Sequence, residues 1–485
     1  MKSLLLLLGM TIPSWVQGAE PCEDFYCYMA LANRASLVML LEVGLVDQAL
    51  AKQIGAAVVQ DNQEQGEPGA RRTSNYLHVE KRLIEIMGPE ASSLHKGRSR
   101  QDLHGTVRRM MIRDALLEVH ADQLSAREAL LGLAERHAHT LIPAYTHGVQ
   151  AQPTAMGHYL LAFAAALARD AQRLHEVFPR INQSSLGAAA LGTSGYPIDR
   201  ERLANLLGFN GPVENSYDAN LVSPVDTRLE FANALAVSAI PIGQLMQNIH
   251  TQYADPSPWM LLGEGQTDVS SIMPQKSNPR ALDRVRSAAS AVVAGAQAVA
   301  IHAHNTNSGM NDYRRIEPLM QVIDDASDMY RNFARVVGAL RIDEQRALAE
   351  LNEDYSTMTE IADTLVRDAN LPFREAHHYA SELTHLGRSA GKRPMDLTDR
   401  ELRRTYQETV GQPLPVPVAA IRAAMDPRVM VETRMGKGGP QPAEVTRMLA
   451  KARSDLAADR QWARETSSAI LAALTDLEKR FNQLL

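Results

Sequence analysis

One polar loop lies between two long apolar stretches of this 485-residue sequence. The segment 263–279, GEGQTDVSSIMPQKSNP, contains Ser270 beside a second serine, followed by Lys276 and Asn278. Polar, glycine-containing loops held between rigid helices are frequent sites of chemistry. The Ser270 hydroxyl could act as a nucleophile or a base, and Lys276 and Asn278 could hold an anion. A serine pair near a lysine is also common in loops without a catalytic role, so this segment alone defines only a candidate site.

Two further segments carry side chains that could bind or react with an anion. The segment 97–102, GRSRQD, offers two guanidinium groups and the backbone N–H groups of a helix start. Taken alone, it is more simply interpreted as a solvated charged turn. The segment 140–153, TLIPAYTHGVQAQP, places Thr146 beside His147. An isolated loop histidine is more often a surface residue than a catalyst, so this segment also needs support from the others.

Taken in order, the three segments resemble the motifs of the argininosuccinate lyase branch of the fumarase/aspartase superfamily. The segments LGAAALGTSGYPIDR (186–200), ENSYDA (214–219) and LPFREAH (371–377) resemble the same branch. The resemblance covers nearly the whole chain after the N-terminal leader. Three motifs in a fixed order are far more specific than any one of them.

The resemblance implies an all-α fold with three domains, and a homotetramer built around a long central helical bundle. Each active site would be assembled from three subunits, with one motif from each. We expect a signal peptide at 1–19, an N-terminal helical domain at 20–112, a central bundle at 113–354 and a C-terminal helical domain at 355–485.

The resemblance also implies the chemistry and the residues that perform it. Members of this superfamily eliminate fumarate from a substituted succinate, by removing a weakly acidic proton beside a carboxylate and then expelling the leaving group. Ser270 matches the general base, while Lys276 and Asn278 match the groups that hold the carboxylate. His147 matches the residue that helps to protonate the leaving nitrogen, and it needs a carboxylate to orient it. Asp283 stands where the branch usually has a glutamate, one methylene longer.

The outer part of the implied site departs from the argininosuccinate enzymes. The implied substrate-binding residues are Ser99, Arg100, Gln101, Thr146, Asn278 and Arg314. Arg314 and Glu317 occupy the places of a glutamine and a lysine that those enzymes use on their substrate. Other departures are Tyr76 for a histidine, Lys96 for a threonine, Gln101 for an asparagine, Val149 for a glutamine and Val269 for a glycine. Changes of charge in a pocket alter specificity. We expect no metal and no cofactor.

We therefore expect a carbon–nitrogen lyase that releases fumarate from an N-substituted aspartate other than argininosuccinate. An exported aminopolycarboxylate lyase would fit this description. The alternatives are an authentic argininosuccinate lyase with an N-terminal extension, a non-catalytic structural homologue, and another branch such as aspartate ammonia-lyase. The identity of the amine and the physiological direction of the reaction remain open.

Composition and charge limit the partners. Apolar residues make up 45% of the chain, the formal net charge is -6 and the pI is near 6.2. Such a chain lacks the basic surface that nucleic acids and anionic membranes require, so we expect neither as a partner.

The first residues predict export. A single lysine is followed by a short apolar run and then small residues, the pattern of a secretory signal peptide, with cleavage after Gly18 or Ala19. We expect a periplasmic or secreted protein, or a cytoplasmic one if the leader is not cleaved. Cys22 and Cys27 could pair in an exported chain, and two free thiols are the alternative.

The periodicity of apolar residues predicts helices almost throughout, with no strands of any length. Long helices are expected at 102–137, 156–178, 227–253, 280–303, 317–351 and 443–484, with shorter ones at 25–60 (broken near Gly44), 76–87 and 203–210. Loops are expected at 61–72, 140–153 and 187–197. The segments 227–253 and 280–303 are so apolar that we expect them to be buried between subunits, where aspartate at Leu235 or Val292 would break the assembly.

Overall fold

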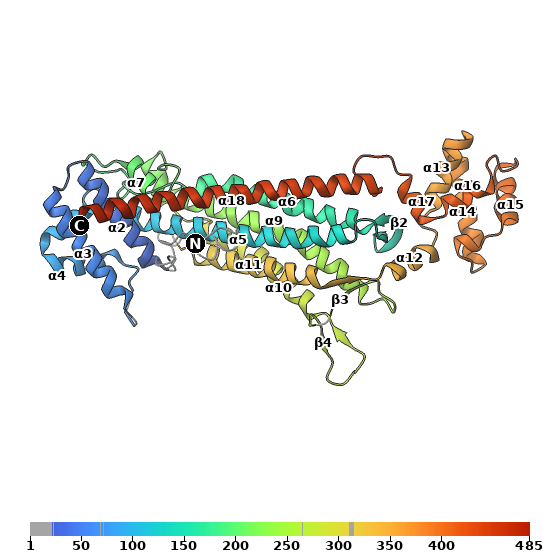
Figure 1. Cartoon of the computed structure of the whole chain (residues 1–485), viewed down its shortest axis with the longest axis horizontal. Helices are drawn as coiled ribbons and strands as arrows, with labels where there is room; N and C mark the ends of the chain where they lie inside the picture. The colour runs from blue at the N-terminus through green and yellow to red at the C-terminus, as the bar shows by residue number, and fades with distance from the viewer. Residues whose placement is uncertain (1–21, 23, 68, 71, 264, 310–314) are drawn as a thin grey trace.

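The computed structural model describes residues 22, 24–67, 69–70, 72–263, 265–309 and 315–485. The predicted signal peptide at 1–19 and the predicted substrate contact Arg314 lie outside these residues. The molecule is elongated, with short helices at each end of a long bundle (Figure 1).

Five long helices and the last helix form the bundle. They are α5 (Arg100–Arg136), α6 (Met156–Ile181), α9 (Ser223–Gln252), α10 (Arg280–Ala303), α11 (Glu317–Ala339) and α18 (Pro442–Leu484). Local sequence explains several of their starts, because Ser99 and Asp102 form a capping box on α5 and prolines occupy the first turn of α9, α11 and α18. One apolar core of leucine, valine, isoleucine and phenylalanine side chains runs through the bundle.

The N-terminal helices cover one end of the bundle. They are α2 (Phe25–Glu42), α3 (Gln48–Gly66), α4 (Tyr76–Met87) and the short 3₁₀ helix η1 (Pro89–His95). The prediction of a loop from residue 61 is wrong, because α3 continues to Gly66 and Asp61 is buried, accepting a hydrogen bond of 2.6 Å from the Tyr26 hydroxyl. A disulfide joins Cys22 to Cys27 in the first turn of α2. The shorter helices α7 (Arg200–Leu206) and α8 (Ser216–Leu221) follow the small-residue loop around Gly187.

Over the residues described, three two-stranded sheets interrupt the helices, so the prediction of no strands is wrong. β1 (Leu141–Thr146) pairs antiparallel with β2 (Val149–Ala155), β3 (Met260–Leu262) with β6 (Leu340–Ile342), and β4 (Asp268–Val269) with β5 (Ser277–Asn278). The helix predicted over 317–351 is therefore broken. The chain leaves α11, pairs through β6 and restarts as α12 (Glu344–Glu353), whose first turn is capped by the Asp343 carboxylate.

The opposite end of the bundle carries a group of short helices around a separate apolar core. These helices are α13 (Met358–Ala369), α14 (Phe373–Ser389), η3 (Pro394–Asp396), α15 (Asp399–Val410), α16 (Val418–Ala424) and α17 (Pro427–Glu432). After α17 the chain turns back, and α18 runs along the bundle to the N-terminal helices, where Phe481 joins their core. The domain boundaries predicted from sequence stay predictions.

The outer faces of α9 and α10 are uncharged over most of their length. On α9 the exposed positions 233, 237, 240, 244 and 247 are Asn, Val, Ile, Gln and Gln, and Ile240 is 52% exposed. Leu235 and Val292 instead lie in the core of the subunit itself, with exposures of 1% and 0%. Aspartate at either position would therefore disrupt the subunit itself. The expectation that these two substitutions would specifically break the contacts between subunits is wrong. In the described part of the chain, α9 alone has the length and composition that could cross a membrane, and here it packs against α6, α10 and α11.

Candidate functional site

The Ser270 loop projects from the side of the bundle (Figure 1). Its base is the pairing of β4 with β5, which places Asp268 opposite Asn278 and Val269 opposite Ser277. An ion pair of 2.8 Å between Arg280 and Asp268 ties this base to the start of α10. The loop is therefore joined to the bundle through a narrow hairpin.

The turn inside this loop brings Ser270 and Lys276 together. The backbone N–H of Ser270 donates to the Lys276 carbonyl at 3.1 Å, and the Lys276 N–H donates to the Met273 carbonyl at 3.0 Å. The Ser270 Oγ accepts hydrogen bonds from the N–H groups of Met273 at 3.1 Å and Ile272 at 3.4 Å. Donors aimed at this oxygen stabilise negative charge on it, which a serine needs if it is to act as a base. Ser270 is half-buried, whereas Ser271 is exposed.

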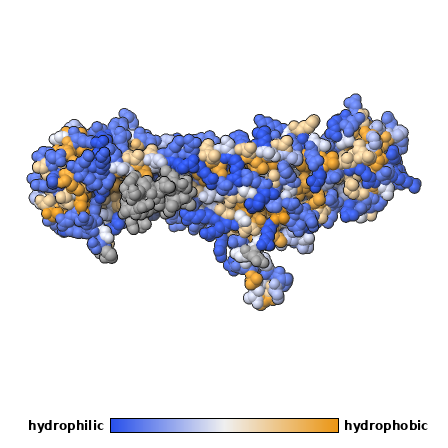
Figure 2. Space-filling view, viewed as in Figure 1, coloured by the Kyte–Doolittle hydropathy of each residue, from blue (hydrophilic) through white to orange (hydrophobic). Residues whose placement is uncertain are grey.

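The loop surface is unusually apolar for an exposed segment. Val269 and Ile272 are 81% and 83% exposed. Figure 2 shows apolar residues near the tip of the projecting loop and along the adjacent flank of the bundle.

His147 lies in the turn of the β1–β2 hairpin. The segment predicted as a loop at 140–153 is thus an ordered hairpin, in which α12 packs against β1 and α17 against β2. His147 and Gly148 both have positive φ, 54° and 77°, as a two-residue hairpin turn requires. A non-glycine residue in this conformation is strained, and such strain is concentrated at functional sites. Thr146 and His147 are both exposed.

Tyr145 anchors this hairpin close to its turn. Its hydroxyl bonds to the Glu350 carboxylate on α12 and accepts a hydrogen bond of 3.4 Å from the Trp259 indole, next to β3. Burial, with the hydrogen bond to Glu350, raises the pKa of Tyr145 above its usual value, so this phenol stays protonated. The hairpin with His147 is therefore anchored to the end of the bundle from which the Ser270 loop also departs.

Ser99 begins helix α5 and is held by a buried carboxylate. Asp102 Oδ1 accepts from the Ser99 N–H at 2.8 Å, and Oδ2 accepts from the N–H groups of Gly187 and Ala189 at 2.8 and 2.9 Å. Burial raises the pKa of Asp102 to about 6, although these backbone donors act in the opposite direction. Sequence reasoning did not assign Asp102 a role, although the Ser-x-x-Asp spacing signals a capping box.

Gln101 and Arg100 follow on the first turn of α5. Gln101 Nε2 donates to the Asn220 carbonyl at 3.1 Å, while Arg100 is exposed. Beneath them, Arg98 is buried over the Tyr76 ring, with the guanidinium carbon 4.7 Å from the ring centre, and donates to the Ser36 hydroxyl. Tyr76, one of the departures from the branch, is therefore part of the support of this segment.

One chain does not bring the three motifs together. Helix α5 has 37 residues and so extends about 55 Å, with Ser99 at its start and the His147 hairpin just beyond its end. Asp283, exposed on α10, lies 4.0 Å from His250 and from Arg286, and no described contact joins it to His147. Within the described ranges, no group of three or more His, Cys, Asp or Glu side chains could hold a metal ion.

Known proteins resemble this chain in sequence and in fold. Residues 43–294 match the sequence profile of the lyase family, and residues 355–432 match the C-terminal segment of argininosuccinate lyase. Argininosuccinate lyase of Methanoculleus marisnigri is 32% identical over 97% of this chain and 94% of its own length. Argininosuccinate lyase 2 of Agrobacterium fabrum is 32% identical over 93% of this chain and 91% of its own. The structure of EDDS lyase in complex with formate superimposes with a TM-score of 0.88 and 31% identity, over 95% of this chain and 92% of that one.

Proposed function

This chain belongs to the argininosuccinate lyase branch of the fumarase/aspartase superfamily, and from that premise we propose that it is a carbon–nitrogen lyase releasing fumarate from an N-substituted aspartate. The observation that carries the proposal is the geometry of the Ser270 loop. A serine oxygen with two backbone donors lies one turn away from Lys276, in the order of residues that this branch uses for elimination.

Each residue has a role that its chemistry allows. The Ser270 oxygen removes the proton from the carbon beside the substrate carboxylate, and the ammonium of Lys276 and the amide of Asn278 hold that carboxylate as it gains charge. The carbon–nitrogen bond then breaks, its electron pair leaves with the nitrogen, and His147 helps to protonate the departing amine. Loss of one such stabilising donor typically costs about 3 to 4 kcal/mol in the transition state.

We propose that the active form is a homotetramer in which three subunits supply these residues to each site. Ser99 and the His147 hairpin lie at opposite ends of α5, a helix about 55 Å long, and this supports the proposal because motifs so far apart in one chain would meet across subunits. The uncharged outer face of α9 and the exposed Val269 and Ile272 supply surface that subunit contacts would cover.

The substrate is proposed to differ from argininosuccinate. Tyr76 and Gln101 are built into the support of the Ser99 segment, so these departures change the residues nearest to the proposed carboxylate contacts. A solved relative at 31% identity is named EDDS lyase, whereas curated relatives at 32% identity are named argininosuccinate lyase. Relatives equally similar to this chain are therefore named for different substrates. The alternative, an authentic argininosuccinate lyase, is favoured by the curated relatives.

We also propose that the protein is exported. The composition of residues 1–19 supports a cleaved leader, and the Cys22–Cys27 disulfide suits an oxidising compartment. Mass spectrometry of the mature protein should find an N-terminus at residue 19 or 20. A chain that begins at Met1 in the cytosol would contradict the proposal.

The activity is tested by fumarate absorbance during incubation with a panel of N-substituted aspartates, argininosuccinate and aspartate. We expect fumarate from an N-substituted aspartate other than argininosuccinate. Preferential turnover of argininosuccinate would establish the alternative, and release from aspartate alone would indicate an ammonia-lyase. No fumarate from any compound, with an intact tetramer, would favour a structural homologue.

A further inference from the structure

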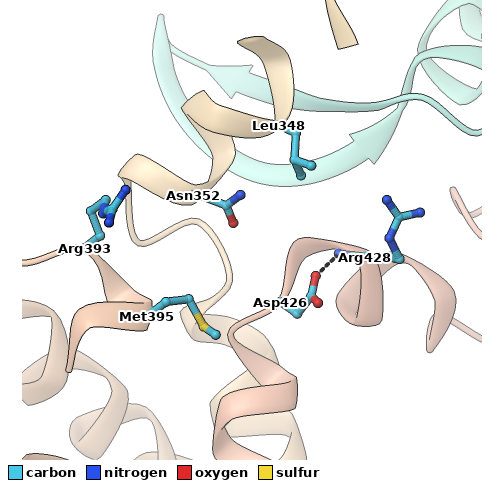
Figure 3. Close-up of a pocket in the computed structure, with 6 residues that line it drawn as sticks. All are labelled: Leu348, Asn352, Arg393, Met395, Asp426 and Arg428. Atoms are coloured by element: carbon cyan, nitrogen blue, oxygen red, sulfur yellow. Dashed lines mark hydrogen bonds between the residues drawn. The ribbon is translucent and has the colours of Figure 1, made fainter. Parts of the chain in front are cut away.

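A cavity of about 410 Å³ lies between α12, η3 and α17, where the bundle meets the C-terminal helices. Figure 3 shows Leu348 and Asn352 entering it from α12, with Arg393 and Met395 on one side and Asp426 and Arg428 on the other. Its volume is in the range of small-molecule sites. None of these residues belongs to the three motifs described above.

The lining combines charges that suit one class of ligand. Arg393 and Arg428 approach from different elements and can each bind a carboxylate. The Asp426 carboxylate accepts the backbone N–H of Arg428 at 2.8 Å and can bind an ammonium group with its remaining lone pairs. Asn352 adds an amide, and Leu348 and Met395 add apolar surface for methylene groups.

The two arginines are available to a ligand to different degrees. Among the described residues, the Arg428 guanidinium group forms no hydrogen bond or ion pair, and the residue is exposed. Arg393 pairs with Asp396 at 3.0 Å, but both side chains are largely exposed, at 62% and 43%. Exposed ion pairs contribute little free energy, so a ligand carboxylate can share or displace this one.

The walls of the cavity also hold the hairpin that carries His147. On α12, Glu350 bonds to Tyr145 and Glu344 accepts a hydrogen bond of 2.8 Å from Thr140 at the foot of β1. Leu351 of α12, Leu141 of β1 and Val431 of α17 form one small buried cluster. A ligand that draws α12 and α17 together would therefore act on the hairpin through contacts already present.

We propose that this cavity binds a small amino-dicarboxylate, the chemical class of L-aspartate, and that the bound ligand stabilises the hairpin 141–155. The proposal does not depend on the proposed reaction, because binding and hairpin order can be measured without turnover. If the site exists, the concentration of such a compound would adjust the order of the segment carrying Thr146 and His147.

The test uses calorimetric titration of L-aspartate into the full-length Ser270→Ala protein, in which turnover is removed. We expect a binding event that Arg428→Met weakens about ten-fold or more, since a charge-assisted contact is lost. The matched control is Arg400→Met, which removes an exposed arginine from α15. Asn352→Leu, expected to weaken the same event, provides a second variant in case Arg428→Met alters folding. Equal affinity in all of these proteins would overturn the proposal.

Two further measurements define the ligand class and its effect. Succinate, which lacks the ammonium group, and inorganic phosphate at equal ionic strength should compete poorly with L-aspartate, and equal competition by phosphate would refute the assigned class. Hydrogen exchange of 141–155 should slow with L-aspartate in the Ser270→Ala protein but not after Arg428→Met. Slowing that persists in the Arg428→Met variant would place the ligand elsewhere and refute the site.

Discussion

The Ser99 segment and the Ser270 loop, both candidate contacts of the same substrate, are built in opposite ways. Ser99 is fixed by Asp102, a fully buried carboxylate that also holds the backbone at Gly187 and Ala189. Ser270 lies in a projecting turn whose hydrogen bonds are almost all local and whose apolar side chains are exposed. From this difference we propose that the Ser99 segment is a rigid surface that would receive the substrate and that the Ser270 loop is a movable segment that would carry the base.

Separation of the subunits should have the largest effect on activity, because it would part the Ser99 segment of one subunit from the Ser270 loop of another. Ile240→Asp places a charge on the uncharged outer face of α9, where burial against another subunit would cost several kcal/mol. We expect light scattering to show dissociation and fumarate release to fall below detection, with the circular dichroism of the subunit unchanged. Arg335→Asp, on the charged outer face of α11, is the matched control and should stay assembled. Full activity from a monomer would refute a shared site.

Removal of the proposed base should leave assembly intact and abolish most turnover. Ser270→Ala is expected to lower kcat by about 100- to 10,000-fold, because general-base catalysis contributes on this scale. Substrate binding should change little, since the hydroxyl acts in the transition state. Ser271→Ala, at the exposed neighbouring serine, should stay within a few-fold of the parent. A Ser270→Ala enzyme with near-normal kcat would contradict the mechanism.

Substitution of Asp102 in the Ser99 segment should lower the free energy of unfolding. Asp102→Ala leaves the buried N–H groups of Gly187 and Ala189 without their acceptor, and each unsatisfied group costs about 1–3 kcal/mol. We expect urea unfolding to show a loss of a few kcal/mol, while Asp328→Ala on the exposed face of α11 shows almost none. Unchanged stability after Asp102→Ala would mean that the segment is held by other contacts.

Protonation of Asp102 at acidic pH should stabilise the folded protein. Its pKa in the folded protein is raised to about 6 from an ordinary value near 3.8, so the folded state binds the proton more tightly. The contribution of this group to stability is therefore present at low pH and declines as pH rises from about 4 to 6. Replacement by asparagine should remove that component from the pH dependence of unfolding, and an unaltered pH profile would show that Asp102 titrates normally.

Sequence patterns predicted the helices far better than the hairpins. The bounds Tyr76–Met87 and Arg280–Ala303 were both correct, because apolar residues recur with the helical period and Gly88 and Pro279 mark the limits. The 141–155 hairpin was missed because β1 packs against α12 and β2 against α17, and these helices lie about 200 to 290 residues further along the chain. Local periodicity carries no information on such distant contacts.

The sequence likewise predicted only those parts of the candidate site that local motifs define. Ser270, Lys276 and His147 were selected from motifs, and the expectation that they come from different subunits followed from the family resemblance. The role of Asp102 depends on its contact with Gly187, 85 residues away, and the cavity beside Leu348 is lined by residues up to Arg428. Both features arise only when distant segments pack together.

The smallest expected effect concerns the motion of the Ser270 loop. Its base has only four paired residues, and Gly265, with φ of 80°, lies in the segment that leads into it. We expect hydrogen exchange over 265–279 to be fast in the free protein and several-fold slower with saturating fumarate, because the ligand carboxylate would hold Lys276 and Asn278. Exchange over 99–106, where Asp102 already fixes the backbone, should change little.

Lys276→Met should abolish the slowing in the loop without altering exchange at 99–106. Equal protection of both segments by fumarate would show that they move together, and the proposed division between a rigid and a movable segment would then be wrong.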